Sequence, residues 1–394
     1  MGAVLCLVPH GLIAAAGATP TPSSSPPVTS CEALARSAVP SPIPTDRAPE
    51  ASARPIADVD SSRPTAGTPV AFAPRWTAVP PAPFGAEYGI AGWTGTSLIV
   101  VDPASGRTAT WNGRGDGGWR ERARAPFGRP VHFSPSVIAA GHLVVLAGDE
   151  GTPGAVMFDS TADAWTVLAT PPIGPVVAAV WTGELVVAAA YGGSTAAYDP
   201  GTDCWMSLPS VPGAGSLVTL LWTGERVLAD TRTPVESAST ERHVAVAQLD
   251  PVTLTWTAGA DAPFPIGHGH QAVWADGAVH YWSWAPRAPE DGDGGLDEGV
   301  NARYDPVEDE WQPLEVECRT SAQGTVSTGD LLLATNGRLA FDASDGSCLE
   351  LPRPPRRLPG RSAAVWTDDA FVIWSGTRTE AGPAVRDGLM LRTR

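Results

Sequence analysis

The sequence predicts an all-β protein in which seven four-stranded antiparallel sheets close into a ring, a seven-bladed β-propeller. Trp residues punctuate the chain at intervals of roughly 40–50 residues, the repeat length of a propeller blade. Each interval contains three apolar stretches separated by turn residues. The chain also has 42 Gly and 40 Pro, which is more than helices tolerate.

Seven positions mark where one unit ends and the next begins. The unit after Trp165 shows the pattern most clearly: a strand over 176–181, a Thr-Gly turn, a second strand within 184–193, and a third strand that ends at Tyr198-Asp199-Pro200. The inner strands, such as the stretches from Leu143 to Ala147 and from Leu185 to Ala190, are expected to be buried on both faces, because they alternate poorly between apolar and polar residues. The seven delimiting positions are Trp76, Trp119, Trp165, Trp205, Trp256, Trp311 and Cys348.

Two kinds of turn recur within each unit. The first strand ends in Trp-Thr-Gly or a variant, and its Gly or Asp supplies the positive φ of a tight hairpin. The Trp before this turn is expected to pack between neighbouring blades rather than to bind a ligand. The third strand ends in Asp, which we expect to cap the next turn rather than to form a carboxylate array. These residues are Asp159, Asp199, Asp250, Asp305 and Asp342.

The two ends of the repeat region complement each other. Three strands are predicted over 362–393 with no fourth strand after them, whereas Trp76 to Pro80 is a fourth strand with no set before it. Pairing them would close the ring and remove both free sheet edges, which places Trp76 in the same blade as Phe371. A ring of six or eight blades remains the alternative if one blade is miscounted.

The repeat resembles the Kelch repeat of galactose oxidase-type propellers, most clearly from Tyr191-Gly192-Gly193 to Trp205. The resemblance covers residues 76–394 and implies ring closure by an N-terminal strand. The chain departs from the family pattern because only the third unit keeps the double Gly, Cys348 replaces a Trp, and the sixth unit is short.

The first 74 residues are not expected to belong to the propeller. Residues 1–18 resemble a signal peptide, since the apolar run from Leu5 to Ala18 is too short for a transmembrane span and ends in Ala-Gly-Ala, although a basic start is missing. Residues 19–74 form a Pro- and Ser-rich stretch that predicts a disordered linker. Small residues before Cys31 offer an alternative, a lipid anchor on that cysteine. The propeller is assigned to residues 75–394, and the protein to the extracellular space or cell envelope.

The charge of the chain excludes several functions. With 26 Arg and Lys against 42 Asp and Glu the net charge is −16, so nucleic acid is not an expected partner. Every basic residue is Arg. The absence of Lys excludes the phosphate-binding lysine of a P-loop and a Schiff-base lysine.

The cysteine count fits an oxidising compartment. Cys6 would leave with the signal peptide, and the remaining four are an even number. We expect a disulfide between Cys318 and Cys348 that compensates for the missing Trp, and a second between Cys31 and Cys204 that ties the linker to the propeller. Four cysteines allow three connectivities, so the alternatives stay open.

A set of cationic or titratable residues precedes several first strands. In an antiparallel four-stranded blade this connection lies on the same face as the loop between the second and third strands, so these residues could surround one mouth of the channel as an anion site. The alternative is that they cap backbone groups at strand starts. They are Arg129, His132, His268, His270, Arg319 and Arg361.

The longest insertions fall on the same face, at 230–242 and 286–299. The second contains an acidic, Gly-rich stretch in which Asp291, Asp293 and Asp297 could offer oxygen ligands to Ca²⁺. The alternative is an ordinary solvated loop.

These observations favour an exported, non-catalytic scaffold that binds a protein or glycan ligand at its loop face. Copper-radical oxidase chemistry, by resemblance, needs two His ligands and a Tyr cross-linked to Cys, and no such set can be assembled from five Tyr and five Cys. No cofactor is therefore expected. The alternative is a carbohydrate-active or related enzyme with its site at the channel mouth, which needs acids and bases that converge in one pocket.

Overall fold

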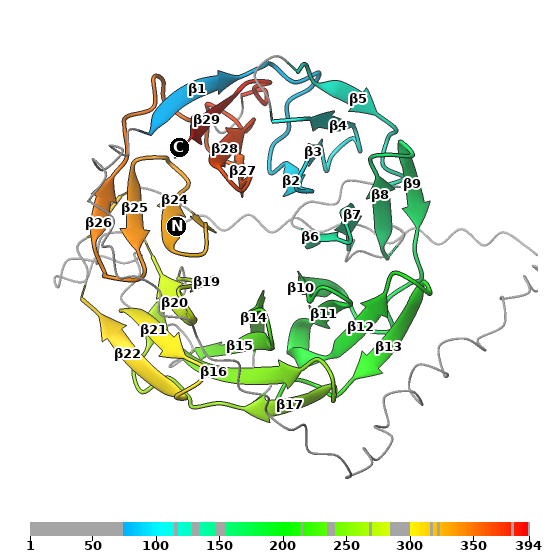
Figure 1. Ribbon diagram of the computed structural model, residues 1–394. Helices are drawn as coiled ribbons and strands as arrows, with labels where there is room; N and C mark the ends of the chain where they lie inside the picture. The colour runs from blue at the N-terminus through cyan, green and yellow to red at the C-terminus, as the bar shows by residue number, and fades with distance from the viewer. Residues whose placement is uncertain are drawn as a thin grey trace, which may run out of the picture.

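The computed structural model confirms an all-β ring of seven four-stranded blades (Figure 1). The expected signal peptide, the linker as far as residue 73 and Cys31 lie outside the described residues. Within the described part of the chain, the one helical element is the 3-10 turn η1 (Tyr191–Gly193). The structure describes residues 74–113, 117–127, 134–146, 154–213, 216–234, 241–267, 270–283, 300–315, 318–320, 324–379 and 382–392.

In blades one to six the strands pair in chain order from the channel outward. Blade one contains β2 (Ile90–Trp93), β3 (Leu98–Val101), β4 (Thr108–Trp111) and β5 (Arg120–Arg122). Blade two contains β6 (Ser136–Ala139), β7 (His142–Val145), β8 (Val156–Asp159) and β9 (Ala164–Val167). Blade three contains β10 (Val176–Trp181), β11 (Val186–Ala190), β12 (Thr195–Asp199) and β13 (Cys204–Leu208). Blade four contains β14 (Ser216–Trp222), β15 (Val227–Pro234), β16 (Glu241–Asp250) and β17 (Thr255–Ala258).

The remaining blades continue the ring. Blade five contains β19 (Gln271–Ala275), β20 (Ala278–Trp282), β21 (Asn301–Asp305) and β22 (Glu310–Leu314). Blade six contains β23 (Thr325–Ser327), β24 (Leu331–Ala334), β25 (Leu339–Asp342) and β26 (Cys348–Glu350). Blade seven contains β27 (Ala363–Trp366), β28 (Ala370–Trp374), β29 (Gly388–Arg392) and, as its outermost strand, β1 (Arg75–Val79).

The predicted closure is confirmed. Strand β1 pairs antiparallel with β29, with Trp76 opposite Leu391. The rings of Trp76 and Phe371 lie 6.3 Å apart. The first and last strands of the propeller therefore complete one blade: β29 is paired on both sides, and β1 is the outer strand.

The core lies between the blades. Strands such as β3 and β11 are buried along their whole length, which explains why they read as continuous apolar runs. Each hydrophobic cluster joins two neighbouring blades: Ala178 and Val187 of blade three, for example, pack in one cluster with Leu220 and Val227 of blade four. A blade therefore buries its apolar surface only when both neighbours are present.

The delimiting Trp residues staple each blade to the one before it. The indole N–H donates to a backbone carbonyl that lies four residues after the delimiting position of the preceding blade. We call this contact the indole staple. Its five members are Trp119 to Pro80 (2.7 Å), Trp165 to Ala123 (2.9 Å), Trp205 to Ala169 (2.7 Å), Trp311 to Ala260 (2.8 Å) and Trp76 to Pro352 (2.6 Å).

A carboxylate completes the staple where the stapled residue has an N–H. The N–H of Ala169 donates to Asp203 (2.9 Å), which also accepts from the hydroxyl of Tyr198 (2.9 Å). The same arrangement joins Ala260 to Asp309, and Ala123 to Asp163. Each of these Asp residues lies two positions before a delimiting Trp with φ between 51° and 56°, a conformation that Asp tolerates better than most residues.

Where the stapled residue is Pro, the carboxylate is absent. Pro80, Pro209 and Pro352 have no N–H to donate. The residues that correspond to Asp203 at these three joints are Gly117, Leu254 and Pro74. At the joint after Pro209, Trp256 donates to the hydroxyl of Thr195 (3.4 Å), which in turn donates to the Pro209 carbonyl (2.6 Å).

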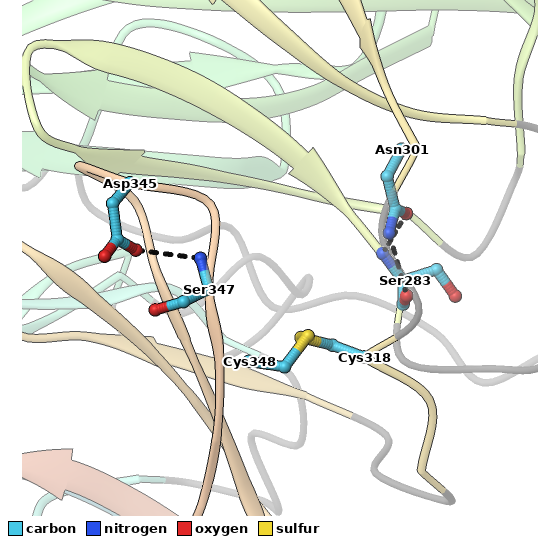
Figure 2. Close-up of a disulfide and its surroundings, with 6 residues drawn as sticks. All are labelled: Ser283, Asn301, Cys318, Asp345, Ser347 and Cys348. Carbon is cyan, nitrogen blue, oxygen red and sulfur yellow. Dashed lines mark hydrogen bonds between the residues drawn. A yellow bond between two sulfur atoms is a disulfide. The ribbon is translucent and has the colours of Figure 1, made fainter.

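The remaining joint carries the predicted disulfide. Cys348 lies at the delimiting position of blade six and is bonded to Cys318, in the connection from blade five, with their Cα atoms 5.6 Å apart (Figure 2). The bond therefore takes the place of the missing indole staple. Cys204 is also disulfide-bonded. Its expected partner, Cys31, lies outside the described residues.

The insertion expected over 230–242 is partly strand. Strands β15 and β16 extend the hairpin of blade four beyond the length of the other blades, with Pro234 opposite Arg242. A short strand, β18 (Ile266–Gly267), adds to the end of β16. The hydrogen bonds of the hairpin therefore continue into a region that sequence patterning assigns to a loop.

The coupling between proline and carboxylate at the joints can be tested by building the missing arm. We expect Pro209→Ala combined with Leu254→Asp to be more stable than the sum of the single changes by about 1 kcal/mol, because only the double variant gains the N–H···carboxylate bond. Urea unfolding of the four proteins measures this. Strictly additive free energies of unfolding would contradict the assignment.

The disulfide should stabilise the ring mainly by shortening the unfolded chain between two residues that are 30 positions apart. We expect Cys348→Ala to lower the free energy of unfolding by about 3 kcal/mol. Cys318→Ala/Cys348→Trp should recover about 1 kcal/mol of this loss, because the new indole can staple blade six. An unchanged denaturation midpoint in Cys348→Ala would refute the structural role of the bond.

Candidate functional site

The antiparallel order of the strands gives the propeller two different faces. The loop face carries the inter-blade connections and the loops between second and third strands. The turn face carries the tight turns between first and second strands and between third and fourth strands. The turn-forming role of the strand-end Asp residues is confirmed: Asp199, for instance, accepts from the backbone N–H of Gly201 (2.7 Å).

Several predicted site residues lie outside the described residues. They include members of both predicted sites, the anion site and the calcium loop. The residues concerned are Arg129, His132, His268, Asp291, Asp293 and Asp297. The strands that flank the calcium loop are described: the side-chain amide oxygen of Asn301 accepts from the backbone N–H of Ser283 (3.0 Å) at the base of that loop (Figure 2).

His270 lies on a buried ion pair between blades four and five. Its side chain is 4% exposed, and its backbone carbonyl accepts from Arg232 (2.7 Å). Arg232 donates twice to Asp230, whose other oxygen accepts from the N–H of Thr219 (3.0 Å). Burial raises the pKa of Asp230, and the neighbouring guanidinium opposes that rise. The pair therefore orders the connection that carries His270.

Arg361 joins blade seven to blade one. It has a φ of 58°, its guanidinium lies 5.4 Å from the ring centre of Tyr88, and it pairs with Glu87. Arg319 is half-buried and has interaction partners of its own. Arg361 and His270 thus contact different blade junctions and are not in contact with each other.

A group of Arg residues, of which sequence reasoning identified only Arg361, lies on two adjoining segments at blade seven. It comes from the connection over 351–362 and from the loop over 375–387 in blade seven, which a β-bridge between Gly360 and Thr377 holds together. We call this cluster the arginine patch. Its members are Arg353, Arg356, Arg357, Arg361, Arg378 and Arg386.

The arginine patch has more positive charge than its described neighbours neutralise. Arg356 and Arg378 share one carboxylate, Asp387. Burial and the nearby Arg378 lower the pKa of Arg356. Arg353 and Arg357 are exposed and have no partner among the described residues. The patch can therefore accept further carboxylates, which Arg binds in a two-pronged geometry.

An open groove adjoins the arginine patch at the ring closure. It is lined by proline and tryptophan rings together with two guanidinium groups. Its lining residues are Pro74, Arg75, Trp76, Pro352, Arg353 and Pro355. In the sequence this region is marked by the Pro-Arg-Pro-Pro-Arg-Arg segment at 352–357. Its place in a groove became evident only because the ring closure puts this segment beside β1.

His280 is a buried titratable group in blade five. It is 1% exposed, and its ring centre lies 5.9 Å from that of Phe341. Burial and the nearby Arg303 lower its pKa to about 4. The side chain is therefore neutral at physiological pH and fills the space between blades five and six.

The described residues contain no candidate metal centre and no candidate membrane-spanning helix. In the described ranges no three His, Cys, Asp or Glu side chains lie close enough together to hold a metal ion. No helix among the same residues is long and apolar enough to cross a membrane.

Comparison with known proteins supports the fold alone. No family profile and no curated protein matches the chain. The solved structure of YjhT has a TM-score of 0.46 and 13% identity over 79% of this chain and 96% of its own. The extracellular domain of BT4673 from B. thetaiotaomicron has a TM-score of 0.52 and 10% identity over 80% of this chain, which spans 39% of that larger protein. At such identities the likeness shows a propeller and does not transfer a function.

The neutral, buried His280 should make stability depend on pH. Its pKa is lower in the folded state than the ordinary 6.5, so the unfolded chain takes up the proton first as the pH falls. We expect stability to fall by roughly 3 kcal/mol between pH 6.5 and 4, and His280→Leu to remove this slope. Urea unfolding at each pH measures it. The exposed His243 provides the control, and an equal change of slope in His243→Leu would contradict the assignment.

Proposed function

We propose that this protein is an exported Kelch-like propeller that binds a carboxylate-bearing glycan at the cell surface through the arginine patch. The observation that carries the proposal is the pair of exposed guanidinium groups, Arg353 and Arg357, that have no described partner in a chain of net charge −16. Two exposed guanidinium groups without partners would gain charge-assisted hydrogen bonds from an anionic ligand.

The groove beside the patch favours a glycan over an acidic protein segment. Its proline and tryptophan rings offer flat apolar surfaces, and Arg75 and Arg353 stand beside them. Tyr88, which is 37% exposed, adds another ring next to Arg361. Flat rings bordered by guanidinium groups suit a polymer that alternates apolar sugar faces with carboxylates.

Binding rather than catalysis suits these residues. Arg stays protonated throughout the physiological range, so the patch supplies charge and hydrogen bonds but cannot transfer protons. The one carboxylate at its centre, Asp387, is already held by Arg356 and Arg378. Export is supported by the apolar N-terminus and by disulfide-bonded cysteines, which persist in oxidising compartments.

The proposal predicts selective binding of polygalacturonate over neutral dextran. We expect Arg353→Gln/Arg357→Gln to weaken polygalacturonate binding about tenfold in isothermal titration, because two charge-assisted contacts are lost. Arg120→Gln/Arg226→Gln removes the same charge away from the patch and serves as the control. An equal loss in the control pair, or tight binding of dextran, would overturn the proposal. Polyglutamate is included, and preference for it would indicate an acidic protein partner instead.

A further inference from the structure

One position of the repeat brings half-buried side chains to the turn face around the channel. It is the residue of each innermost strand that directly precedes the turn to the second strand, except in blades two and five, where one more residue intervenes. The innermost strands surround the centre of the ring (Figure 1). The seven residues are Trp93, Ile138, Trp181, Trp222, Trp274, Ser327 and Trp366. We call the five Trp residues of this set the tryptophan ring.

The tryptophan ring packs between blades, and among the described residues only Trp93 uses its indole N–H there. Each indole contacts the cluster shared with the preceding blade, as Trp222 does with the cluster of blades three and four. Trp93 donates its N–H to Asp368 of blade seven (2.7 Å). Within the described residues the other four indole nitrogens of the ring make no hydrogen bond.

The delimiting Trp residues use their indole nitrogens, whereas the buried Trp374 of blade seven leaves its own without a hydrogen bond. All six delimiting Trp residues donate their N–H to an acceptor of a neighbouring blade. The five ring Trp residues are each half-buried and leave four indole donors without a hydrogen bond among the described residues. Packing alone does not require this, because the apolar Ile138 and the small Ser327 fill the same position in blades two and six.

Carboxylates surround the tryptophan ring. Those in the turns next to the channel are Glu184, Glu225, Asp276, Asp330, Asp368 and Asp369, all exposed. The outer turns of the same face add Asp159, Asp163, Asp199, Asp203, Asp250, Asp305, Glu308, Asp309, Asp342 and Asp345. Among the described residues of these turns the only Arg is Arg226, which pairs with Asp250. At the strand ends Arg122, Arg303 and Arg392 pair with three more of these carboxylates, which still outnumber the Arg residues. The turn face is therefore acidic, with aromatic rings at its centre.

This combination selects a cationic partner. The face of an indole ring attracts guanidinium and ammonium groups, most strongly where carboxylates stand nearby. The turns are short and leave a broad surface rather than a deep pocket, which suits a protein surface better than a small molecule. Trp is also among the residues enriched at the energetic centre of protein interfaces.

We propose that the turn face is a docking surface for a basic protein segment whose Arg or Lys side chains insert at the tryptophan ring. The surface is opposite the arginine patch and has the opposite charge. If this docking proposal fails, the glycan proposal is unaffected, because the two proposals rest on different residues.

The test measures binding of a dye-labelled deca-arginine peptide to the full chain at physiological ionic strength by fluorescence anisotropy. We expect Trp222→Leu/Trp274→Leu to raise the Kd about tenfold, since two cation–π contacts are lost. Glu184→Gln/Glu225→Gln should raise it about fivefold. The control Glu308→Gln/Glu310→Gln removes the same charge at the outer edge of blade five and should change the Kd by less than about twofold.

Two further measurements keep the result decisive. Trp222→Phe/Trp274→Phe retains aromatic faces and should bind the peptide more tightly than the Leu pair, which separates loss of the ring from loss of folding. Polygalacturonate binding should be unchanged in both Trp pairs. The proposal is overturned if the control charges matter as much as the inner ones, if the Trp pairs bind as the wild type does, or if free arginine amide binds as tightly as the peptide.

Discussion

The structure depends on the joint between the outer strands of neighbouring blades. Blades spread apart with distance from the channel, so the shared apolar clusters are least effective at the rim. There the indole staple adds a directional contact, which ties the Trp205 indole to Ala169 in the preceding blade. Because the ring is closed through β1 and β29, each joint supports the other six. Six indole contacts and one disulfide therefore act together rather than singly.

The staple also explains why distant residues along the chain depend on each other. Whether the stapled residue is Ala or Pro decides whether a donor exists, and the donor decides whether the next blade needs Asp about 34 to 49 residues later, as between Ala169 and Asp203 or between Ala260 and Asp309. These N–H···carboxylate bonds lie near the surface, and a hydrogen bond of this kind contributes about 0.5–1.5 kcal/mol, which gives the pairing its physical basis. Leu254 keeps the positive φ of this position, 56°, but has no carboxylate, because the residue it corresponds with, Pro209, has no N–H to donate.

Much of the fold could be predicted because its signals are local or strictly repeated. The Trp spacing predicted the number of blades, and the unpaired strand at Trp76 predicted the closure of the ring. The missing Trp at Cys348 led us to expect the disulfide. Of the arginine patch only Arg361 was predicted, because the other members come from segments 351–362 and 375–387, which the fold of blade seven brings together through the bridge between Gly360 and Thr377. His270 was expected near the channel mouth. It is buried instead, next to Arg232, which lies in a segment that was expected to be a loop and is a strand. Sequence periodicity predicts the features that every blade repeats, but it does not predict the sites that form where two blades meet.

The arginine patch and the acidic turn face lie on opposite sides of the propeller. At physiological ionic strength fields decay within about 8 Å, so a ligand at the arginine patch experiences the nearby guanidinium groups rather than the net charge of −16. The same screening lets the acidic turn face attract a basic partner independently. A propeller held to an anionic polymer by blade seven would keep its tryptophan ring on the face away from that polymer. The rigid ring then works as a spacer that fixes the orientation of one bound partner relative to the other, which a flexible linker of the same length cannot do.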